Sequence, residues 1–355
     1  MPHFSSDPAP VELHRLDPAA ATPAQWQQFH AFRRLRLGQD FPEDPVMPDH
    51  EAENVLRQQH PIHETQRLLA LRNGEMVGIL TLSCRRDGSP GSEDYVDYVD
   101  ISGGVLRDHR RQGIGRALLQ GLAHFMDQRA KRIATTKVHL PEGHAYMARI
   151  GADCKLRNVE NRLLFDQVDW DALDRWVEPP ALRCSKLSWE IHAGRVPMAR
   201  LESLMEPLTS LLNEQPLGTL DGPRLRYELA SYPTWYADMD RRGGDHFMVL
   251  LRDEGNIAAA CDANWDQRFP GRVHQNLTAV AQPWRGQGLA KAVKARMLKL
   301  VRERRPGVQM VTTYNANANA AMLSINRQLG FAVHREEATY QIGRAALGAY
   351  LARCG

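Results

Sequence analysis

Two similar stretches decide the fold of this chain: Asp97–Arg116 reads DYVDISGGVLRDHRRQGIGR, and Arg272–Lys291 reads RVHQNLTAVAQPWRGQGLAK. They align without a gap at a constant offset of 175 residues, which is close to half of the 355-residue chain. A second match follows in the same order, because IGA at 150–152 corresponds to LGF at 329–331. An internal repeat with this spacing predicts two copies of one structural unit.

Each copy is predicted to contain the same order of strands around one central helix. Extended apolar runs predict strands; they are 67–74, 76–84, 95–105 and 131–140 in the first copy, and 246–255, 256–265, 273–280 and 308–315 in the second. Apolar residues recur at helical spacing in each central helix, namely Ile114, Leu118, Leu122 and Phe125, then Leu289, Val293, Met297 and Leu300. The opposite helix faces carry Arg, Lys and Gln, which we expect to be exposed to water.

The length of the chain fits two domains of typical size. The run WDALDRW at 170–176 predicts a short helix, and the proline pair at 179–180 predicts a linker after it. We therefore expect an N-terminal domain at 1–170, a linker at 171–187 with the boundary near residue 180, and a C-terminal domain at 188–355.

The composition is that of a globular protein, with 43% hydrophobic and 25% charged residues and a net charge of +3. No window approaches the roughly 18 apolar residues of a membrane span, and the first residues lack the pattern of a signal peptide, so we expect a cytoplasmic protein. The basic residues form no separate tail, which gives no indication of nucleic-acid binding. Five cysteines without CxxC spacing predict reduced thiols rather than disulfides or a metal site.

A glycine-containing turn between a strand and a helix is a phosphate-binding arrangement, because the first helical turn offers unpaired N–H groups and a favourable dipole. The first copy supplies Arg110, Arg111, Gln112, Gly113, Ile114, Gly115 and Arg116, and the second supplies Arg285, Gly286, Gln287, Gly288, Leu289, Ala290 and Lys291. Neither turn is a Walker A loop or a G-x-G-x-x-G fingerprint, which disfavours a nucleotide triphosphatase or a dehydrogenase.

These residues resemble the GNAT superfamily of acyl-CoA N-acyltransferases, whose signature is V-x-x-x-x-R-x-x-G-x-G/A. The resemblance implies an α/β fold of the α+β type: two tandem domains, each with a mixed, mostly antiparallel sheet flanked by helices. It implies acetyl-CoA as the donor, with the pyrophosphate on the turn and the pantetheine arm along the strand end at Gly104, Val105, Ala279 and Val280. The strand should splay from its neighbour there, and Gly103–Gly104 suits a bulge.

The second copy carries a further resemblance, to the C-terminal domain of bacterial tandem GNAT proteins, in QNLTAVAQPWRGQGLA and TYNANANAAMLSINRQLGFAV. By that resemblance Asn319 binds the coenzyme A arm. Asn326 takes the place of a proton-donating tyrosine and orients the thioester sulfur; the alternative is a structural amide on the helix face. The first copy reads PEGHAYMARIGAD and has Met147 at the tyrosine position, so it is expected to bind coenzyme A without turnover. This division is similar in layout to the mycothiol synthase group.

Transfer from a thioester to an amine needs a neutral amine, a stabilised oxyanion and a protonated thiolate. His274 is the candidate base on the strand, with a surface histidine as the alternative, while Gln275 and Thr278 would position substrate or water. Cys84 and Cys261 lie in apolar runs typical of buried, inert thiols, which favours direct transfer over a covalent intermediate.

The acceptor is expected to be a primary amine of a small molecule, bound by a monomer or a homodimer. Tyr232, Trp235 and Tyr236 could line its pocket, although helix packing explains them equally well. Three alternatives stay open: a non-catalytic acyl-CoA-binding regulator, a protein or peptide N-acetyltransferase, and a Fem-type aminoacyl transferase. The two intact turns speak against the last, because a transfer RNA donor does not need them.

Overall fold

The computed structural model describes residues 10–179, 182 and 186–353. The chain forms two compact units: the first comprises Met1–Lys155 together with Thr339–Gly355, and the second comprises Leu156–Ala338. This grouping differs from the division into 1–170 and 188–355, because residues 156–170 pack with the second unit and residues 339–355 with the first. The boundary expected near residue 180 and the thiols of Cys184 and Cys354 lie outside the described residues.

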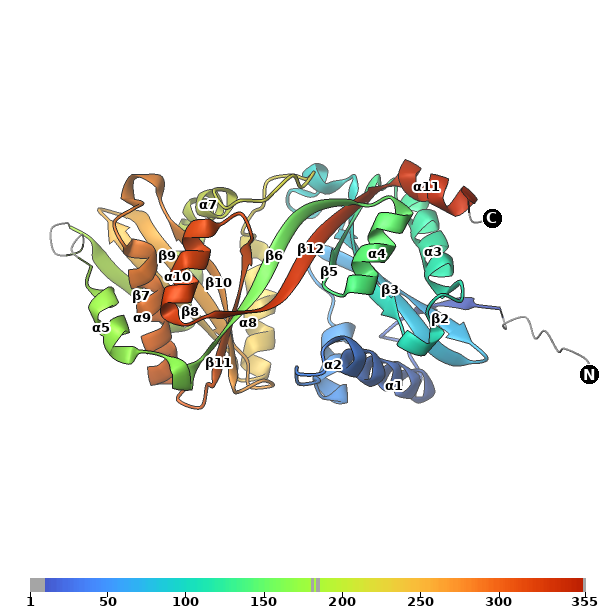
Figure 1. Cartoon of the computed structure of the whole chain (residues 1–355), viewed down its shortest axis with the longest axis horizontal. Helices are drawn as coiled ribbons and strands as arrows, with labels where there is room; N and C mark the ends of the chain where they lie inside the picture. Colours follow the sequence, from blue (N-terminus) through green and yellow to red (C-terminus); the bar gives the residue numbers. More distant parts are fainter. Residues whose placement is uncertain (1–9, 180–181, 183–185, 354–355) are drawn as a thin grey trace, which may run out of the picture. The chain divides into compact units, whose positions relative to one another are not determined.

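The first unit contains a sheet with the strand order β1-β2-β3-β4-β5-β12. Neighbours from β1 to β4 are antiparallel, and β4 and β5 are parallel. Its elements, coloured from blue to green in Figure 1, are β1 (Glu12–Leu16), α1 (Pro23–Asp40), α2 (Asp49–Arg57), β2 (His63–Arg72), β3 (Glu75–Arg85), β4 (Tyr98–Val105), α3 (Ile114–Gln128), β5 (Ile133–Val138), α4 (Pro141–Ile150) and, at the red end of the chain, α11 (Arg344–Arg353).

The second unit has a sheet with the order β6-β11-β10-β9-β8-β7, which mirrors that of the first. Only its β10 and β11 are paired in parallel among the described registers. Its elements are β6 (Asp153–Leu164), α5 (Trp170–Val177), β7 (Ser188–Gly194), α7 (Met198–Asn213), α8 (Tyr232–Arg241), β8 (Asp245–Asp253), β9 (Asn256–Trp265), β10 (Arg272–Val280), α9 (Leu289–Arg304), β11 (Met310–Ala316), α10 (Ala320–Leu329) and β12 (Ala332–Gly343). The repeated strand order confirms the prediction of two copies of one mixed α/β unit.

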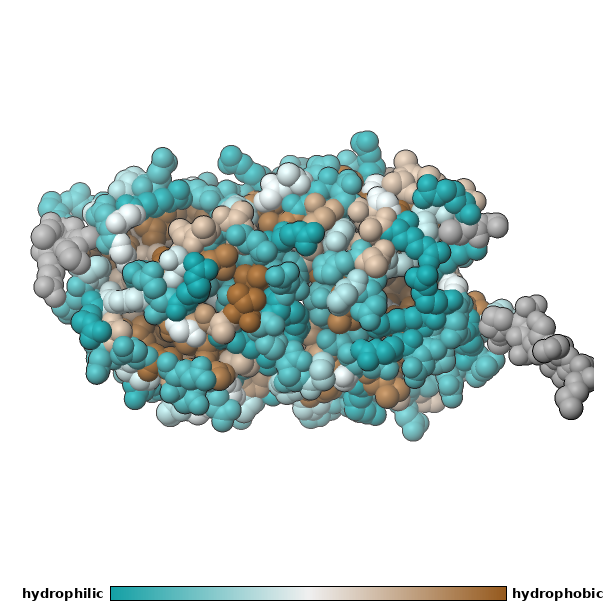
Figure 2. Space-filling view, viewed as in Figure 1, coloured by the Kyte–Doolittle hydropathy of each residue, from teal (hydrophilic) through white to brown (hydrophobic). Residues whose placement is uncertain are grey.

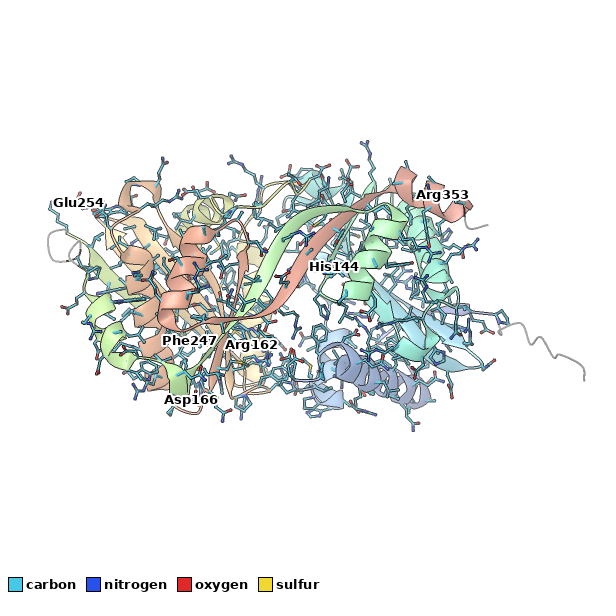
Figure 3. The ribbon with its side chains drawn as sticks, in the orientation of Figure 1. His144, Arg162, Asp166, Phe247, Glu254 and Arg353 are labelled. Atoms are coloured by element: carbon cyan, nitrogen blue, oxygen red, sulfur yellow. The ribbon has the colours of Figure 1, made fainter. Side chains whose placement is uncertain are left out.

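Each unit is completed by a strand from the other half of the sequence. β12 follows α10 of the second unit, but its last residues lie beside β5 in the first, where the Gln341 amide donates to Thr135 Oγ1 at 3.2 Å. The reverse holds for β6, which follows α4 and pairs antiparallel with β11 in the second unit. Tyr340 on β12 is tied to His144 of α4, labelled in Figure 3, by a 3.1 Å hydrogen bond. This exchange explains why contacts group the chain differently from its linear order.

The central helices bury the predicted apolar faces. All eight residues named above are 5% exposed or less, in the cores on α3 and α9. The expectation that the lysines of α9 are exposed is wrong at Lys294, which is fully buried. The reason is that its side chain enters the core beneath α9, where Nζ lies 5.1 Å from the ring of Phe331 and interacts electrostatically with Cys261 of β9.

The aromatic residues of α8 belong to a separate core beneath α7. Tyr232 and Tyr236 are buried there, and the Tyr236 hydroxyl lies 2.8 Å from His246 Nδ1 and accepts the Val196 N–H at 3.2 Å. Trp235 stacks on Tyr236 with ring centroids 5.3 Å apart. Helix packing therefore accounts for these rings.

The described surface is mostly polar. Figure 2 shows hydrophilic residues over most of one face, with apolar residues in small groups. Among the residues searched, no helix combines the length and the apolar character needed to cross a membrane.

Candidate functional site

The strand β10 leaves β11 near its middle and changes its register with β9. It pairs in parallel with β11 only over Arg272–Gln275. On its other side the register with β9 shifts between Gln275 and Thr278, which is a β-bulge with one extra residue. The second half of β10 thus has a free edge toward β11.

A carboxylate on β9 holds the bulge in place. Asp262 Oδ1 accepts the N–H of Leu277 at 2.9 Å, and its Oδ2 accepts the side-chain amide of Asn276 at 3.0 Å. Burial raises the pKa of Asp262 to about 6, against the lowering effect of these two donors. A carboxylate with this pKa is suited to accept a proton near neutral pH.

The equivalent strand of the first unit splays without a bulge. β4 pairs with β5 only over Tyr98–Asp100, so the predicted separation is confirmed. The predicted bulge at Gly103–Gly104 is wrong, because the register with β3 runs unbroken from Asp100 to Val105. A Cβ on Gly103 would lie 2.1 Å from the carbonyl oxygen of Ile79, so glycine permits a close approach here instead.

The turns after β4 and β10 have the same backbone conformation. Gly113 and Gly288 are the N-caps of α3 and α9, with φ of +85° and +81°. Two residues earlier, Gly286 has φ +77° and its counterpart Arg111 has φ +62°. Neither helix has a side-chain cap, so the N–H groups of the first turn are open to an anion.

The motif arginine in each copy ties the strand end to the first long helix of its unit. Arg285 Nε donates to the carbonyl of Val280 at 3.1 Å, and its guanidinium pairs with Glu214 at the C-terminal end of α7. Arg110 Nε likewise donates to the carbonyl of Val105 at 3.0 Å and pairs with Asp40, the last residue of α1, at 3.3 Å. The acidic partners were missed from sequence, although their spacing of 174 residues follows the repeat.

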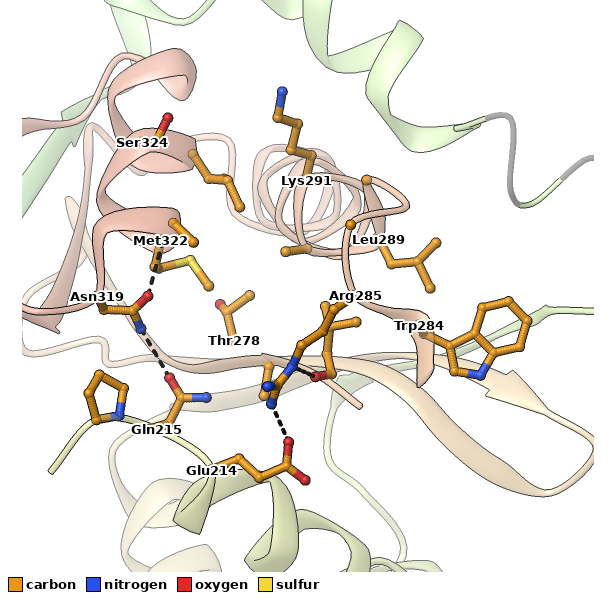
Figure 4. A pocket seen from close by; sticks show the side chains of 18 of the residues that line it. Glu214, Gln215, Thr278, Trp284, Arg285, Leu289, Lys291, Asn319, Met322 and Ser324 are labelled. Atoms are coloured by element: carbon orange, nitrogen blue, oxygen red, sulfur yellow. Dashed lines mark hydrogen bonds and ion pairs between the residues drawn. The ribbon is translucent and has the colours of Figure 1, made fainter. Parts of the chain in front are cut away.

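The free edge of β10 opens onto a cleft of about 610 Å³ in the second unit. Ten of the predicted residues line it: Thr278, Ala279, Val280, Arg285, Gly286, Gly288, Leu289, Ala290, Lys291 and Asn319. Five of them, Thr278, Arg285, Leu289, Lys291 and Asn319, are labelled in Figure 4, around the start of α9, the start of α10 and the end of β10. Residues that sequence reasoning did not find complete the lining, among them Glu214, Gln215, Pro216, Trp284, Met322 and Ile325.

Two polar side chains of the cleft lining, Asn319 and Lys291, make hydrogen bonds to neighbouring side chains. Asn319 caps α10, since its Oδ1 accepts the N–H of Met322 at 3.2 Å, and its amide donates to Gln215 Oε1 at 3.4 Å (Figure 4). Lys291, in the first turn of α9, bonds to Gln328 on α10. A cation in that turn adds to the positive potential of the helix start.

Four of the residues predicted in the second copy do not line the cleft. Gln287 donates to the carbonyl of Pro283 at 3.3 Å, and His274 Nδ1 lies 2.7 Å from Thr312 Oγ1. Gln275 and Asn326 are 2% and 1% exposed, beneath the cleft rather than on its wall.

Three buried polar residues surround Cys261, and we call the four together the buried polar cluster: Gln275, Thr278, Lys294 and Cys261. Gln275 Nε2 donates to Cys261 Sγ at 3.2 Å, and Cys261 Sγ lies 3.5 Å from Thr278 Oγ1. Burial raises the pKa of the Cys261 thiol to about 11, so it is protonated at neutral pH and a poor nucleophile. In the part of the chain that the structure describes, no three His, Cys, Asp or Glu side chains are placed to hold a metal.

The acetyltransferase (GNAT) family profile matches this sequence twice, over residues 29–151 and 206–353. The chain belongs to the GNAT family. Since the two matches cover most of both copies, it is a tandem GNAT protein and an acyltransferase that acts from acyl-CoA.

Solved structures of similar fold include tandem members of the same family. A tandem GNAT protein from the clavulanic acid biosynthesis pathway is 20% identical, with a TM-score of 0.72 over 94% of this chain and 99% of that one. A GCN5-related N-acetyltransferase from Sphaerobacter thermophilus is 15% identical, with a TM-score of 0.63 over 95% and 97%. These likenesses concern the fold alone. A search of the curated proteins gives no significant match.

Proposed function

We propose that this tandem GNAT protein is an N-acetyltransferase, whose second unit moves the acetyl group of acetyl-CoA directly to a primary amine of a small molecule. The observation that carries the proposal is the cleft at the free edge of β10, which ends at the uncapped start of α9. An anion is stabilised at such a helix start, and a free strand edge can pair with an amide-containing arm.

Successive parts of the cleft lining suit successive parts of coenzyme A, from the pyrophosphate to the pantetheine arm. Gly286, Gly288 and Lys291 would hold the pyrophosphate, with Gln287 following the turn through its backbone. The backbone of Ala279 and Val280 would pair with the pantetheine arm, and Asn319 would bond to it from α10. Arg285 contributes by fixing the turn, because its guanidinium is already used by Val280 and Glu214.

The bulge supplies the groups that acyl transfer needs. Backbone N–H groups near Val280 would polarise the thioester carbonyl, and Thr278 lines the same cleft. His274 is the base proposed from sequence, and Asp262 is a second candidate because it holds the bulge and has a raised pKa. Gln275 and Asn326 act from below the cleft as positioning residues.

The first unit, unlike the second, is proposed not to turn over acetyl-CoA. Arg36 of α1 donates to the carbonyl of Gly103 at 3.0 Å, and its Nε would lie 3.1 Å from a Cβ on Gly104. Its guanidinium therefore covers the strand end that corresponds to Ala279 in the second unit. Any binding through Val105, Arg110, Gln112 and Ile114–Arg116 would have to displace it. This contact favours a binding or structural role for the first copy over catalysis.

The test is calorimetric titration with acetyl-CoA, followed by thiol release in the presence of a panel of small primary amines. Gly288→Asp adds a negative charge at the helix start, where we expect loss of binding and of turnover, whereas the matched Gly113→Asp should leave turnover intact. If thiol is released only with peptide amines, the acceptor is a peptide rather than a small molecule. Failure of the wild type to bind acetyl-CoA would remove the transferase proposal.

A further inference from the structure

One face of the second sheet changes from apolar to polar at the bulge in β10. On this face Ala260 and Leu277 belong to the core beneath α7. Successive side chains of a strand point to opposite faces, so Asp262 and Asn264 lie on the same face as Ala260. Both are partly exposed, and Asn264 is the register partner of His274 on β10. The apolar core beneath α7 therefore gives way to polar side chains along β9.

The polar side chains continue onto the next two strands. His274 Nδ1 lies 2.7 Å from Thr312 Oγ1 on β11. Two residues further along β11, Tyr314 is 50% exposed and donates its hydroxyl to Glu160 of β6 at 3.1 Å. Glu160 also accepts from Arg162 Nε at 2.6 Å. We call the surface on β9, β10 and β11 the polar face: Asp262, Asn264, His274, Asn276, Thr312 and Tyr314.

Asp262 is a carboxylate of the polar face without a cationic partner. Its oxygens accept the Leu277 N–H at 2.9 Å and the Asn276 amide at 3.0 Å, and no ion pair joins it to any described lysine, arginine or histidine. With a pKa of about 6 it is ionised at neutral pH. Leu277 directly precedes Thr278, which lines the cleft. A negative charge beside the cleft can be balanced by the ammonium group of an acceptor.

Two side-chain amides flank this carboxylate. Asn276 Nδ2 donates to Asn264 Oδ1 at 3.1 Å as well as to Asp262. Among the residues that the structure describes, Asn264 Nδ2 and Asn276 Oδ1 make no hydrogen bond. Asn276 is exposed and Asn264 partly so. The pair therefore offers one donor and one acceptor to a ligand, which is the complement of a hydroxyl group.

The charges around the polar face do not suit a carboxylate on the ligand. Arg162 already pairs with Glu160, and Arg335 lies 3.9 Å from the same carboxylate. Asp262 would repel a second negative charge at short range. The polar face thus fits an ammonium group that carries a neutral hydroxylated chain.

The corresponding residues of the first copy are apolar. At the offset of 175 residues, His274 and Asn276 correspond to Val99 and Ile101. Val99 is 1% exposed and belongs to the core on α3. The polar residues of β10 are therefore specific to the unit that has the cleft.

We propose that the polar face binds the acceptor, and that this acceptor is a small hydroxylated amine, an amino alcohol or an amino sugar. Asp262 holds its ammonium group beside the cleft, while Asn264 and Asn276 bond to its hydroxyl groups. The inference rests on the proposed function and names the class of amine that the second unit accepts. These three residues determine specificity.

The first experiment compares three amines of equal chain length as acceptors for the wild type with acetyl-CoA: 3-amino-1-propanol, n-butylamine and β-alanine. We expect kcat/KM for 3-amino-1-propanol to exceed that for n-butylamine about tenfold, because only the former has a hydroxyl for the two amides. β-Alanine should be the poorest of the three, because Asp262 repels its carboxylate.

The second experiment tests the hydroxyl contact. Asn264→Ala should lower kcat/KM for 3-amino-1-propanol about tenfold and have little effect on n-butylamine, which has no hydroxyl to lose. The matched control is Asn256→Ala, which removes an exposed amide at the other end of β9 and should match the wild type with both amines.

The third experiment tests the charge. Asp262→Asn keeps an oxygen for the Leu277 N–H and removes the negative charge. It should raise KM for 3-amino-1-propanol and n-butylamine about tenfold each and leave the Kd of acetyl-CoA unchanged. The disadvantage of β-alanine relative to n-butylamine should shrink in the same variant. A purely structural role of Asp262 would not change this ratio.

Each outcome decides one of the two proposals. A wild type that does not bind acetyl-CoA removes the proposed function and this inference together. A wild type that acetylates n-butylamine or β-alanine as well as 3-amino-1-propanol overturns the inference alone, and so does one that binds acetyl-CoA but acetylates neither 3-amino-1-propanol nor glucosamine. If Asp262→Asn does not fold, Asn264→Ala decides: an equal fall of kcat/KM for 3-amino-1-propanol and n-butylamine overturns the hydroxyl contact.

Discussion

The strand ends that precede the two glycine turns share their anchoring and differ in what covers them. Arg110 and Arg285 make the same two contacts, to a strand carbonyl and to an acidic residue at a helix end. The end of β10 is bulged and opens onto the cleft, whereas the end of β4 is regular and lies under Arg36. The comparison teaches that the arginine and glycines of the motif build the turn, while the residues around the strand end decide whether it is accessible.

The equivalent helices α4 and α10 of the two copies differ as well. Ile325 of α10 lines the cleft of the second unit. Its counterpart Tyr146 on α4 brings its hydroxyl to 3.1 Å from the position of a Cβ on Gly115, at the start of α3. A tyrosine thus fills space in the first unit that an isoleucine leaves open in the second.

The largest effect is expected at the strand end itself. Gly103→Ala would place a Cβ 2.1 Å from the Ile79 carbonyl, so we expect a loss of more than about 3 kcal/mol in the unfolding free energy of the first unit. The matched change Thr278→Gly, at a bulge that already accommodates a side chain, should cost about 1 kcal/mol. Denaturant unfolding measures both. Equal losses of unfolding free energy would mean that the bulge in β10 and the glycine in β4 are not two different ways of fitting this strand end against its neighbour.

The pH dependence of stability should distinguish α9 from α3. Burial lowers the pKa of Lys294 to about 8 from 10.5, so above pH 8 the unfolded chain binds more protons than the folded one. Stability contributed by this group therefore rises with pH between 8 and 10.5, by about 3 kcal/mol in total. Urea unfolding of Lys294→Met should lack this rise relative to wild type. A parallel pH dependence of the two proteins would contradict the lowered pKa.

The acidic partners of the motif arginines should have smaller effects. Glu214→Gln removes one partly exposed ion pair, so we expect a loss of about 1 kcal/mol. Asp40→Asn removes the ion pairs of a buried carboxylate with Arg110 and with Arg36, so we expect a loss of about 2 kcal/mol. Glu214→Gln should also weaken acetyl-CoA binding a few-fold by loosening the turn, and Asp40→Asn should not. Calorimetry and thermal unfolding test this. A loss of binding in Asp40→Asn would show that the first unit contributes to the measured site.

The smallest effect is expected at the left-handed residue of each turn. Arg111 holds φ +62°, a conformation that glycine adopts at lower cost, so Arg111→Gly should stabilise the first unit by about 0.5 kcal/mol. The reverse change Gly286→Arg should destabilise the second by about 1 kcal/mol. Thermal unfolding of the two variants gives the comparison, and changes of the same sign would contradict it.

Much of the site was predictable because its signals are local. A turn, a helix N-cap and a strand end are read from neighbouring residues, so Gly288, Val280 and Asn319 could be placed in one site before their contacts were known. Glu214 and Gln215 could not, because they come from a helix end that precedes Arg285 by 71 residues and Asn319 by 104, and packing brings them together.

The sequence by itself determined the duplication, four strands and the central helix of each copy, the glycine-containing turns and the resemblance to the GNAT family, since each follows from periodicity or from a short motif. Only the tertiary structure decided the exchange of β6 and β12, the bulge in β10 rather than β4, and the burial of Lys294. The physical reason is that these features depend on which distant segments pack together. A lysine on a helix is exposed or buried according to what covers it, and the residues next to Lys294 in the sequence do not record that Phe331 and Cys261 lie over it.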